Sequence, residues 1–291
     1  MKKSIVFIGL TFFISWLLAG LFYFFGGRWN TSSARIMAVA YMFAPMTSAI
    51  IVQKFIYGEP VKKPLGISFK LNRWFLVAWL LPSLWAIASA GVSLLFPGVE
   101  YSPNMEGMFE RFREILPPER MEQMKSQAAS SFVHPVFLAL IMGLVAGVTI
   151  NAVAGFGEEL GWRGLLVHEW QNMGFWKSSA LIGFVWGIWH APFILQGHNY
   201  PQHRVAGVFM MIIWCMLMSP IFSYVRLRAK SVIAAAILHG SLNGTASLSI
   251  MMLKGGNDMI IGLPGIAGLV VLAFVNIGLA CHLGWAREDQ Q

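Results

Sequence analysis

Three short segments of the 291-residue sequence place polar and ionisable residues within otherwise apolar stretches. The residues concerned are Glu158, Glu159, Arg163, His190, His239 and Asn243. On a helix, Glu159 and Arg163 lie one turn apart with the acid N-terminal, which is the favourable order for an ion pair. Glu158 points about 100° away on the same helix and therefore has no local partner of its own.

The two histidines lie well inside apolar runs, and each shares a helix face with another residue. Trp186 lies one turn before His190, and Pro192 breaks or kinks the helix just beyond. His239 and Asn243 are also one turn apart. Considered singly, these groups have structural explanations: a charged helix end at the membrane surface, a histidine satisfied by a freed carbonyl, and an interhelical hydrogen bond.

Together, the acid pair, two imidazoles and an amide form a set of groups that could activate water. A carboxylate can take a proton from water, an imidazole can orient that water, and further donors can stabilise an oxyanion. Glu158, His190 and His239 could also hold Zn²⁺ with an open position for water. The His-Glu-x-x-His motif is absent, because the segment that starts at His168 has Asn172 in the last position.

The composition predicts that membrane-spanning helices carry these residues. Of the sequence, 57% is hydrophobic and only 12% is charged, against about 25% charged in a soluble domain, which excludes a soluble fold. Mostly apolar runs of about 17 to 25 residues can cross a hydrocarbon core of roughly 30 Å. Eight such runs cover residues 4–25, 36–52, 74–96, 132–156, 178–195, 205–224, 231–253 and 259–283.

Continuous apolar runs favour helices over a β-barrel, because a helix satisfies its own backbone hydrogen bonds in lipid. We therefore expect an all-α polytopic helix bundle that forms a single integral-membrane domain, residues 1–291, in the cell membrane. Glycines four residues apart predict close helix packing near the polar segments. These pairs are Gly143/Gly147, Gly157/Gly161, Gly183/Gly187 and Gly240/Gly244. The two cysteines, Cys215 and Cys281, lie in apolar runs, so no disulfide framework is expected.

The distribution of Lys and Arg predicts that both termini are cytoplasmic. With the N-terminus inside, thirteen of the 21 basic residues fall on the cytoplasmic side: Lys2, Lys3, Lys54, Lys62, Lys63, Lys70, Arg73, Arg163, Lys177, Arg226, Arg228, Lys230 and Arg287. Loop charges that face an anionic leaflet explain the net charge of +8. No basic cluster interleaves with exposed aromatic residues as nucleic-acid-binding surfaces do, so we expect the lipid bilayer and no nucleic acid as a partner.

Residues 97–131 are polar and predict an extramembrane segment. We expect an amphipathic helix over residues 105–125, broken at Pro117-Pro118, that acts as a lid or an interfacial element.

The expected depth of the reactive groups in the membrane is not the same for all of them. At 1.5 Å per residue, a straight fourth helix would carry Glu158 to or past the cytoplasmic boundary, although His190 and His239 lie deeper. Either that helix enters the membrane later than residue 132 or the membrane thins around a cavity.

The polar segments occur in a recognisable order. Glu158-Glu159-x-x-x-Arg163, an aromatic-x-x-x-His motif ending at His190, and His239-x-x-x-Asn243 resemble the three signature motifs of the CPBP or ABI family of intramembrane endopeptidases. This family includes type II CAAX prenyl proteases and bacteriocin-immunity proteins. The resemblance assigns residues 133–253 as a CPBP-like catalytic core. The second motif usually begins with Phe, whereas this sequence has Trp186 there.

The resemblance implies hydrolysis of a peptide bond in a membrane-associated peptide or protein, with CAAX-type prenylated proteins among the candidate substrates. It implies that Glu158 is the general base on a water held by His190, and that His239 and Asn243 donate to the oxyanion. Arg163 would pair with Glu159 to order the helix. Members of the family are labelled both metalloproteases and glutamate-dependent proteases, so bound zinc stays open.

Two other classes of function also stay open. A membrane scaffold or immunity protein could keep the motifs and act by binding. A transporter is less favoured, because transporters place polar residues on broken helices in two repeated halves, and the sequence shows no such correspondence.

Overall fold

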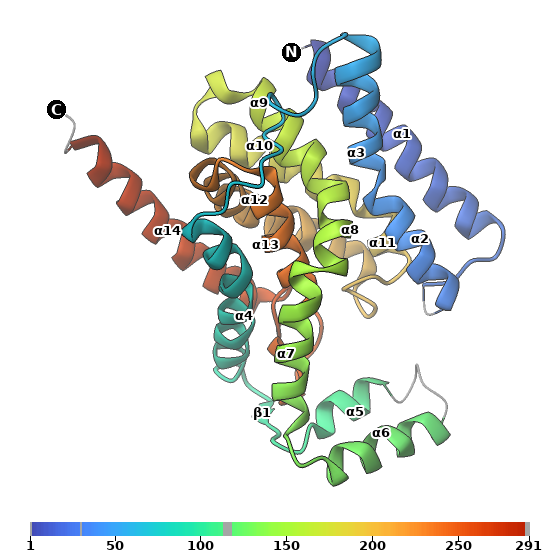
Figure 1. Ribbon diagram of the computed structural model, residues 1–291. Helices are drawn as coiled ribbons and strands as arrows, with labels where there is room; N and C mark the ends of the chain where they lie inside the picture. The colour runs from blue at the N-terminus through green and yellow to red at the C-terminus, as the bar shows by residue number, and fades with distance from the viewer. Residues whose placement is uncertain (1, 30, 113–117, 289–291) are drawn as a thin grey trace.

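The computed structural model describes residues 2–29, 31–112 and 118–288 and shows an all-α polytopic helix bundle (Figure 1). The helical elements are α1 (Lys2–Phe24), α2 (Ser32–Met42), α3 (Ala44–Ile50), η1 (Ile51–Ile56), α4 (Arg73–Ser93), α5 (Glu106–Phe112), α6 (Pro118–Ser130), α7 (Pro135–Val148), α8 (Ile150–Glu159), η2 (Leu160–Leu166), α9 (Val167–Glu169), η3 (Gln171–Met173), α10 (Phe175–Trp189), α11 (Ala191–Leu195), α12 (Arg204–Ala229), α13 (Val232–Thr245), η4 (Ala246–Ser249) and α14 (Ile266–Glu288). The short strands β1 (Val99–Tyr101) and β2 (Leu253–Gly255) pair antiparallel.

The bundle contains membrane-spanning helices at most of the expected apolar runs. Within the described residues, five segments are long and apolar enough to span a bilayer: Lys2–Phe24, Ser33–Ile56, Arg73–Ser93, Arg204–Ala229 and Ile266–Gly284. A sixth span results if α7 and the helical segment Ile150–Glu169, which are bent by 51°, are taken together. The expected count of eight is therefore not confirmed.

The two remaining apolar runs form α10 and α13, which are too short to span. They contain 15 and 14 residues, and are about 22 and 21 Å long at 1.5 Å per residue, against a hydrocarbon core of roughly 30 Å. α10 packs against α12, and α13 packs against α7, α8 and α4. A helix enclosed by other helices needs apolar residues as much as a helix that faces lipid does. Apolar runs alone therefore do not fix the number of spans.

Glycines allow α13 to lie directly against α7 and α8, as the sequence predicted. A Cβ atom on Gly143 would collide with the backbone of Gly244, and one on Gly147 would collide with Ser241. The other glycines of the predicted pairs also lack room for a side chain: Gly157, Gly161, Gly183, Gly187 and Gly240. This close packing brings the backbones of the helices that carry the polar motifs together.

A bend at Thr149 sets the position of Glu158. α7 ends at Val148, Thr149 has non-helical backbone angles, and its hydroxyl donates to the carbonyl of Val145 at 2.7 Å. α8 then leaves in a different direction. A straight helix from residue 132 would have carried Glu158 to the membrane boundary, and the bend removes the premise of that estimate.

A partly buried non-helical segment, residues 256–265, precedes α14. The backbone N–H groups of Gly262 and Leu263 donate to side-chain hydroxyls of Ser93 and Ser249, both at 3.0 Å. Side chains also donate to its carbonyl oxygens: Trp214 to Leu263 at 2.9 Å and Tyr200 to Pro264 at 2.7 Å. Buried backbone groups outside a helix need such partners, and here four side chains supply them.

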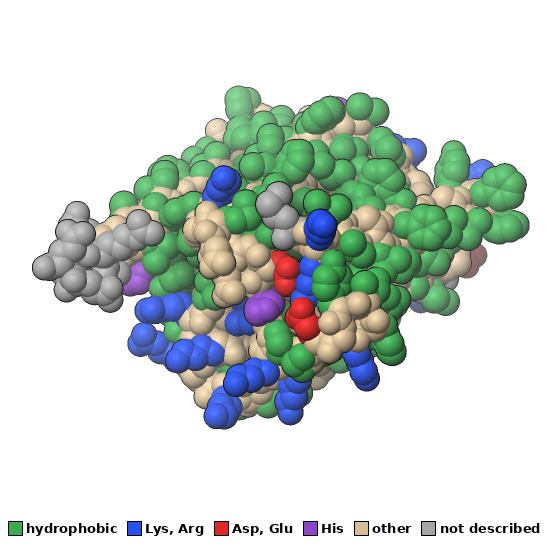
Figure 2. All heavy atoms as spheres, turned by 90° about the horizontal axis from the view of Figure 1, so that it is seen from above, with side chains coloured by type: hydrophobic (Ala, Val, Ile, Leu, Met, Phe, Trp, Pro, Cys, Tyr) green, Lys and Arg blue, Asp and Glu red, His purple; other side chains and the backbone are tan. Residues whose placement is uncertain are grey.

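The 97–131 segment and the two chain ends lie at opposite ends of the molecule (Figure 1). The segment contains two helices, α5 and α6, which agrees with the expectation of a helix broken near Pro118. Of the predicted Pro117-Pro118 break, Pro118 begins α6 and Pro117 lies outside the described residues. Figure 2 looks down on the end where α1 begins and shows Lys and Arg side chains gathered along one side. The cytoplasmic location of this end stays a prediction, and the side chain of Arg287 lies outside the described ones.

Candidate active site

Four of the six residues singled out in the sequence meet in one buried cluster. Glu158 and Glu159 end α8, Arg163 follows in the π-helical turn η2, and His239 comes from the middle of α13. Their exposed fractions are 2%, 0%, 0% and 4%, respectively. A π-helical turn is rare and occurs often at functional sites. In this chain, it directly follows the two carboxylates.

Glu159 forms the centre of one half of the cluster. Nη1 of Arg163 donates to Oε1 of Glu159 at 3.2 Å, so the ion pair expected from the sequence is present. Nδ1 of His239 lies 2.8 Å from the same oxygen. Arg163 was also counted among the basic residues on the cytoplasmic side; its side chain is fully buried, and its side of the membrane stays a prediction. Glu158, Glu159 and Arg163 are therefore not a charged helix end that is exposed to solvent.

Two aromatic rings enclose the guanidinium of Arg163. Its central carbon lies 4.3 Å from the ring centroid of Trp186 and 4.7 Å from that of Phe222. Such cation–π contacts stabilise a desolvated cation. Nε and Nη2 of Arg163 have no hydrogen-bond partner in the described part of the chain. The rings and Glu159 together therefore hold this cation.

Glu158 forms the other half of the cluster. Nε1 of Trp186 donates to Oε2 of Glu158 at 2.8 Å, and Oε1 lies 3.8 Å from Nε2 of His239. The second distance is too long for a direct hydrogen bond, and a contact of this length is one that a water molecule can bridge. The sequence identified Trp186 as an aromatic residue beside His190, but its role as a donor depends on which face of α10 meets α8.

His190 lies beside the cluster at the junction of α10 and α11, close to the helix break that Pro192 predicted. Its Nδ1 lies 2.8 Å from the carbonyl oxygen of Trp186. A carbonyl only accepts, so Nδ1 carries the proton, and in the neutral ring Nε2 keeps a free lone pair. Trp186 thus contacts His190 through its backbone and Glu158 through its side chain.

Asn243 is a candidate residue that does not belong to the buried cluster. It lies one turn after His239 on α13, but its side chain is exposed. No hydrogen bond joins it to the carboxylates or the imidazoles within the described residues. A different amide, that of Asn151 on α8, donates to the carbonyl oxygen of Gly240 at 3.3 Å and links α8 to α13.

A comparison with known protein families matches the region of the chain that contains this cluster. Residues 133–245 match the family model described as Rce1-like, type II CAAX prenyl endopeptidase Rce1-like. The chain carries an Rce1-like region. The match contains all six residues of the three motifs and agrees with the family resemblance seen in the sequence. The Rce1-like family implies a protease. No curated protein matches the chain.

The donor set of the Rce1-like region does not fit a three-ligand zinc site as arranged. No group of three His, Cys, Asp or Glu side chains that could hold a metal occurs among the residues that the structure describes. Of the three candidate ligands, Glu158 and His239 approach each other, whereas His190 is held by a backbone carbonyl.

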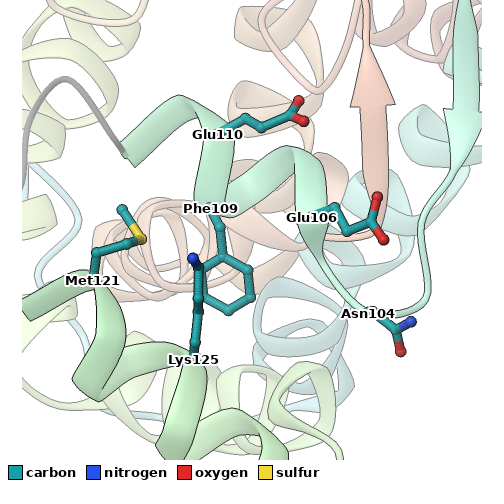
Figure 3. Close-up of a pocket in the computed structure, with 6 residues that line it drawn as sticks. All are labelled: Asn104, Glu106, Phe109, Glu110, Met121 and Lys125. Carbon is teal, nitrogen blue, oxygen red and sulfur yellow. The ribbon is translucent and has the colours of Figure 1, made fainter. Parts of the chain in front are cut away.

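A separate cavity of about 350 Å³ lies between α5 and α6, outside the Rce1-like region. In Figure 3, Phe109 of α5 and Lys125 of α6 face each other across it. It contains none of the motif residues, since its lining consists of Asn104, Glu106, Phe109, Glu110, Met121 and Lys125. The reactive cluster and this cavity are therefore distinct features.

Proposed function

We propose that the protein is an intramembrane endopeptidase that hydrolyses a peptide bond of a membrane-associated peptide or protein, with Glu158 as the general base. The observation that carries the proposal is the 3.8 Å separation between Oε1 of Glu158 and Nε2 of His239, both on buried side chains. The Rce1-like match supports proteolysis as the reaction class.

Hydrogen-bond chemistry explains how this pair would hold water. The Glu159 carboxylate, paired with Arg163, accepts from Nδ1 of His239, so Nδ1 carries the proton and Nε2 of the neutral ring is an acceptor. The facing oxygen of an ionised Glu158 is also an acceptor. Two acceptors 3.8 Å apart are satisfied by one molecule that donates to both, and water has two O–H groups.

The proposed reaction uses this water as the nucleophile. Glu158 takes one water proton while the water oxygen bonds to the carbonyl carbon of the scissile peptide. The tetrahedral intermediate then collapses, the carbon–nitrogen bond breaks, and Glu158 returns the proton to the leaving amine. The products are a carboxylic acid and an amine, and transfer of the acid proton to the amine gives a carboxylate and an ammonium group. Trp186 holds the second oxygen of Glu158 and so fixes the direction of the reactive one.

His190 and Asn243 are proposed to contact the substrate. Nε2 of His190 is free to accept a hydrogen bond, and the exposed amide of Asn243 can reach a bound peptide without displacing a partner in the described structure. Arg163 and Glu159 position His239. The family description supports a CAAX-type prenylated protein as the substrate class.

A comparison of membrane proteomes tests the proposal. Membranes from cells that produce the wild type are compared with those that produce Glu158→Gln, and new peptide termini are identified by mass spectrometry. Glu119→Gln, an exposed glutamate on α6, is the matched control. We expect specific termini with the wild type and the control and none with Glu158→Gln.

The same variant separates catalysis from binding. If Glu158→Gln supports a cellular phenotype as fully as the wild type does, the protein acts as a scaffold or an immunity protein. Cleavage by purified Glu158→Gln at the wild-type rate would refute the assignment of the base.

A further inference from the structure

The start of α4 and the turn between α12 and α13 are joined at one end of the bundle. Nδ2 of Asn72 donates to the carbonyl oxygen of Ala229 at 3.0 Å, and Oγ of Ser231 donates to that of Ser68 at 2.5 Å. These bonds connect segments 157 and 163 positions apart. Basic residues from two distant parts of the sequence therefore lie at the same place.

Five basic residues flank this junction, and we refer to them as the basic cluster: Lys70, Arg73, Arg226, Arg228 and Lys230. All except Arg226 are exposed. Within the described residues, no Asp or Glu side chain forms an ion pair with any of them. A concentration of like charge without counter-charges produces a positive potential that attracts anions.

Aromatic residues orient two of the guanidinium groups. The central carbons of Arg73 and Arg228 lie 5.9 and 5.6 Å from the ring centroid of Trp74. Arg228 also lies 5.5 Å from the ring of Tyr224, which packs edge-on against Trp74 at 5.2 Å. Stacking fixes the plane of a guanidinium and leaves its N–H groups free. A planar fork of N–H donors matches the oxygen atoms of a phosphate group.

Arg226 adds a buried donor beneath this surface. Its guanidinium lies directly against Gly66, where a Cβ atom would collide with it, and Gly66 has a φ of +70° that favours glycine. Nε of Arg226 has no hydrogen-bond partner in the described structure. The cluster therefore includes an unpaired donor in addition to its exposed cations.

Neighbouring apolar side chains point to lipid as the source of the anion. Phe69 and Leu71 flank Lys70 and are 76% and 78% exposed. The spans Arg73–Ser93 and Arg204–Ala229 begin and end here, so the cluster lies where these helices leave the hydrocarbon core. Trp and Tyr are enriched at such interfaces. Acyl chains can contact Phe69 and Leu71 while a headgroup lies over the arginines.

We propose that the basic cluster binds the phosphate of an anionic phospholipid headgroup. The test adds phosphatidylglycerol or phosphatidylcholine to the purified full-length protein in detergent and counts bound lipids by native mass spectrometry. Replacing both stacked arginines, R73Q with R228Q, should weaken phosphatidylglycerol binding about tenfold or more. The control K62Q with K63Q removes the same charge from exposed residues of the loop before α4 and should bind as the wild type does.

A second lipid, inorganic phosphate and one more double variant complete the test. Phosphatidylcholine should bind more weakly than phosphatidylglycerol, and excess inorganic phosphate should not displace the lipid. Equal losses in the two double variants, equal binding of both lipids, or full displacement by inorganic phosphate would each overturn the proposal. R73K with R228K keeps the charge and the fold but loses the planar fork. Its binding should fall between those of the wild type and the R73Q with R228Q variant, and unchanged binding would contradict a stacked-arginine site.

Discussion

The indole nitrogen of Trp186 lies 2.8 Å from a carboxylate oxygen of Glu158, and this bond joins α10 to α8. The same tryptophan accepts a hydrogen bond from His190 through its carbonyl oxygen and covers Arg163 with its ring. One residue therefore contacts the proposed base, the buried cation and the imidazole of His190. Phe at this position would keep the ring but would lose the N–H donor.

Trp186→Phe tests this hydrogen bond. A hydrogen bond to a charged group contributes about 1.5 to 3 kcal/mol, so we expect kcat to fall about 10- to 100-fold. KM should change little, because the Trp186 indole donates to the proposed base and not to the substrate. Trp189→Phe is the matched control, since that indole donates to Ser15 at 2.8 Å and not to a carboxylate. Equal losses of kcat in both variants would show that the Trp186 donor has no special role.

Glu158→Gln and His190→Ala should each abolish cleavage while the protein stays folded. Removal of a general base costs about 10²- to 10⁴-fold in rate, and removal of the His190 imidazole removes its proposed contact with the substrate. Steady-state kinetics with a peptide substrate, together with gel filtration and thermal unfolding, measure both parts. Full activity in either variant would contradict the role assigned to that residue.

Arg163→Met should destabilise the protein strongly. It leaves the buried Glu159 carboxylate without its cation, and breaking a buried ion pair costs about 3 to 5 kcal/mol. Adding Glu159→Gln removes the uncompensated charge, so the double variant should recover much of the loss. Thermal unfolding in detergent measures the series. If both single variants unfold at the wild-type temperature, the pair does not stabilise the fold.

Acidification should weaken the attachment of α1 to the loop after η1. Nζ of Lys3 lies 2.7 Å from Glu59, and this hydrogen bond lowers the pKa of the Glu59 carboxyl. The stabilisation is therefore complete above the usual pKa of a glutamate and is lost as the pH falls through the lowered value. It should amount to less than about 1 kcal/mol, because Glu59 is 43% exposed and salt screens the pair.

Glu59→Gln should accordingly lower the unfolding temperature at neutral pH and have no effect at a pH where Glu59 is protonated. Glu100→Gln, an exposed residue of β1, is the control. An effect of the same size at every pH would rule out the ion pair as its cause.

Metal analysis tests the zinc prediction of the sequence. Because only Glu158 and His239 of the three candidate ligands approach each other, we expect the active purified protein to contain less than one zinc per chain and to withstand chelators. Elemental analysis measures the zinc bound per chain, and an activity assay after chelation shows whether cleavage requires it. One zinc per wild-type chain, absent from Glu158→Gln and required for cleavage, would reverse this expectation.

Much of the fold follows from local properties of the sequence. Long apolar runs predicted the five spans, because crossing lipid requires length and hydrophobicity together. The close approach of α13 to α7 followed from glycine spacing. The same reasoning did not separate α10 and α13 from the longer spans, because burial in protein and burial in lipid select the same residue types. The bend at Thr149 was not predicted, because neither the length of apolar runs nor the spacing of glycines indicates it.

The candidate site was predictable in its members but not in its contacts. The spacing of Glu159 and Arg163 predicted their ion pair, since both lie on one helical stretch. The contacts of Glu158 with Trp186 and His239 join separate helices, and the rotation of each helix decides them. Helical spacing placed Asn243 beside His239, yet the two side chains differ in exposure because α13 is only partly enclosed.

The partly buried segment 256–265 bears on how the protein is assembled. Its backbone groups bond to side chains of Ser93, Tyr200, Trp214 and Ser249, all of which precede it in the sequence. During synthesis, these partners are therefore made before the segment emerges from the ribosome. Its polar backbone can then move directly from water into prepared hydrogen bonds, without an interval of exposure to lipid. The order of residues along the chain thus suits the order in which the bundle has to be built.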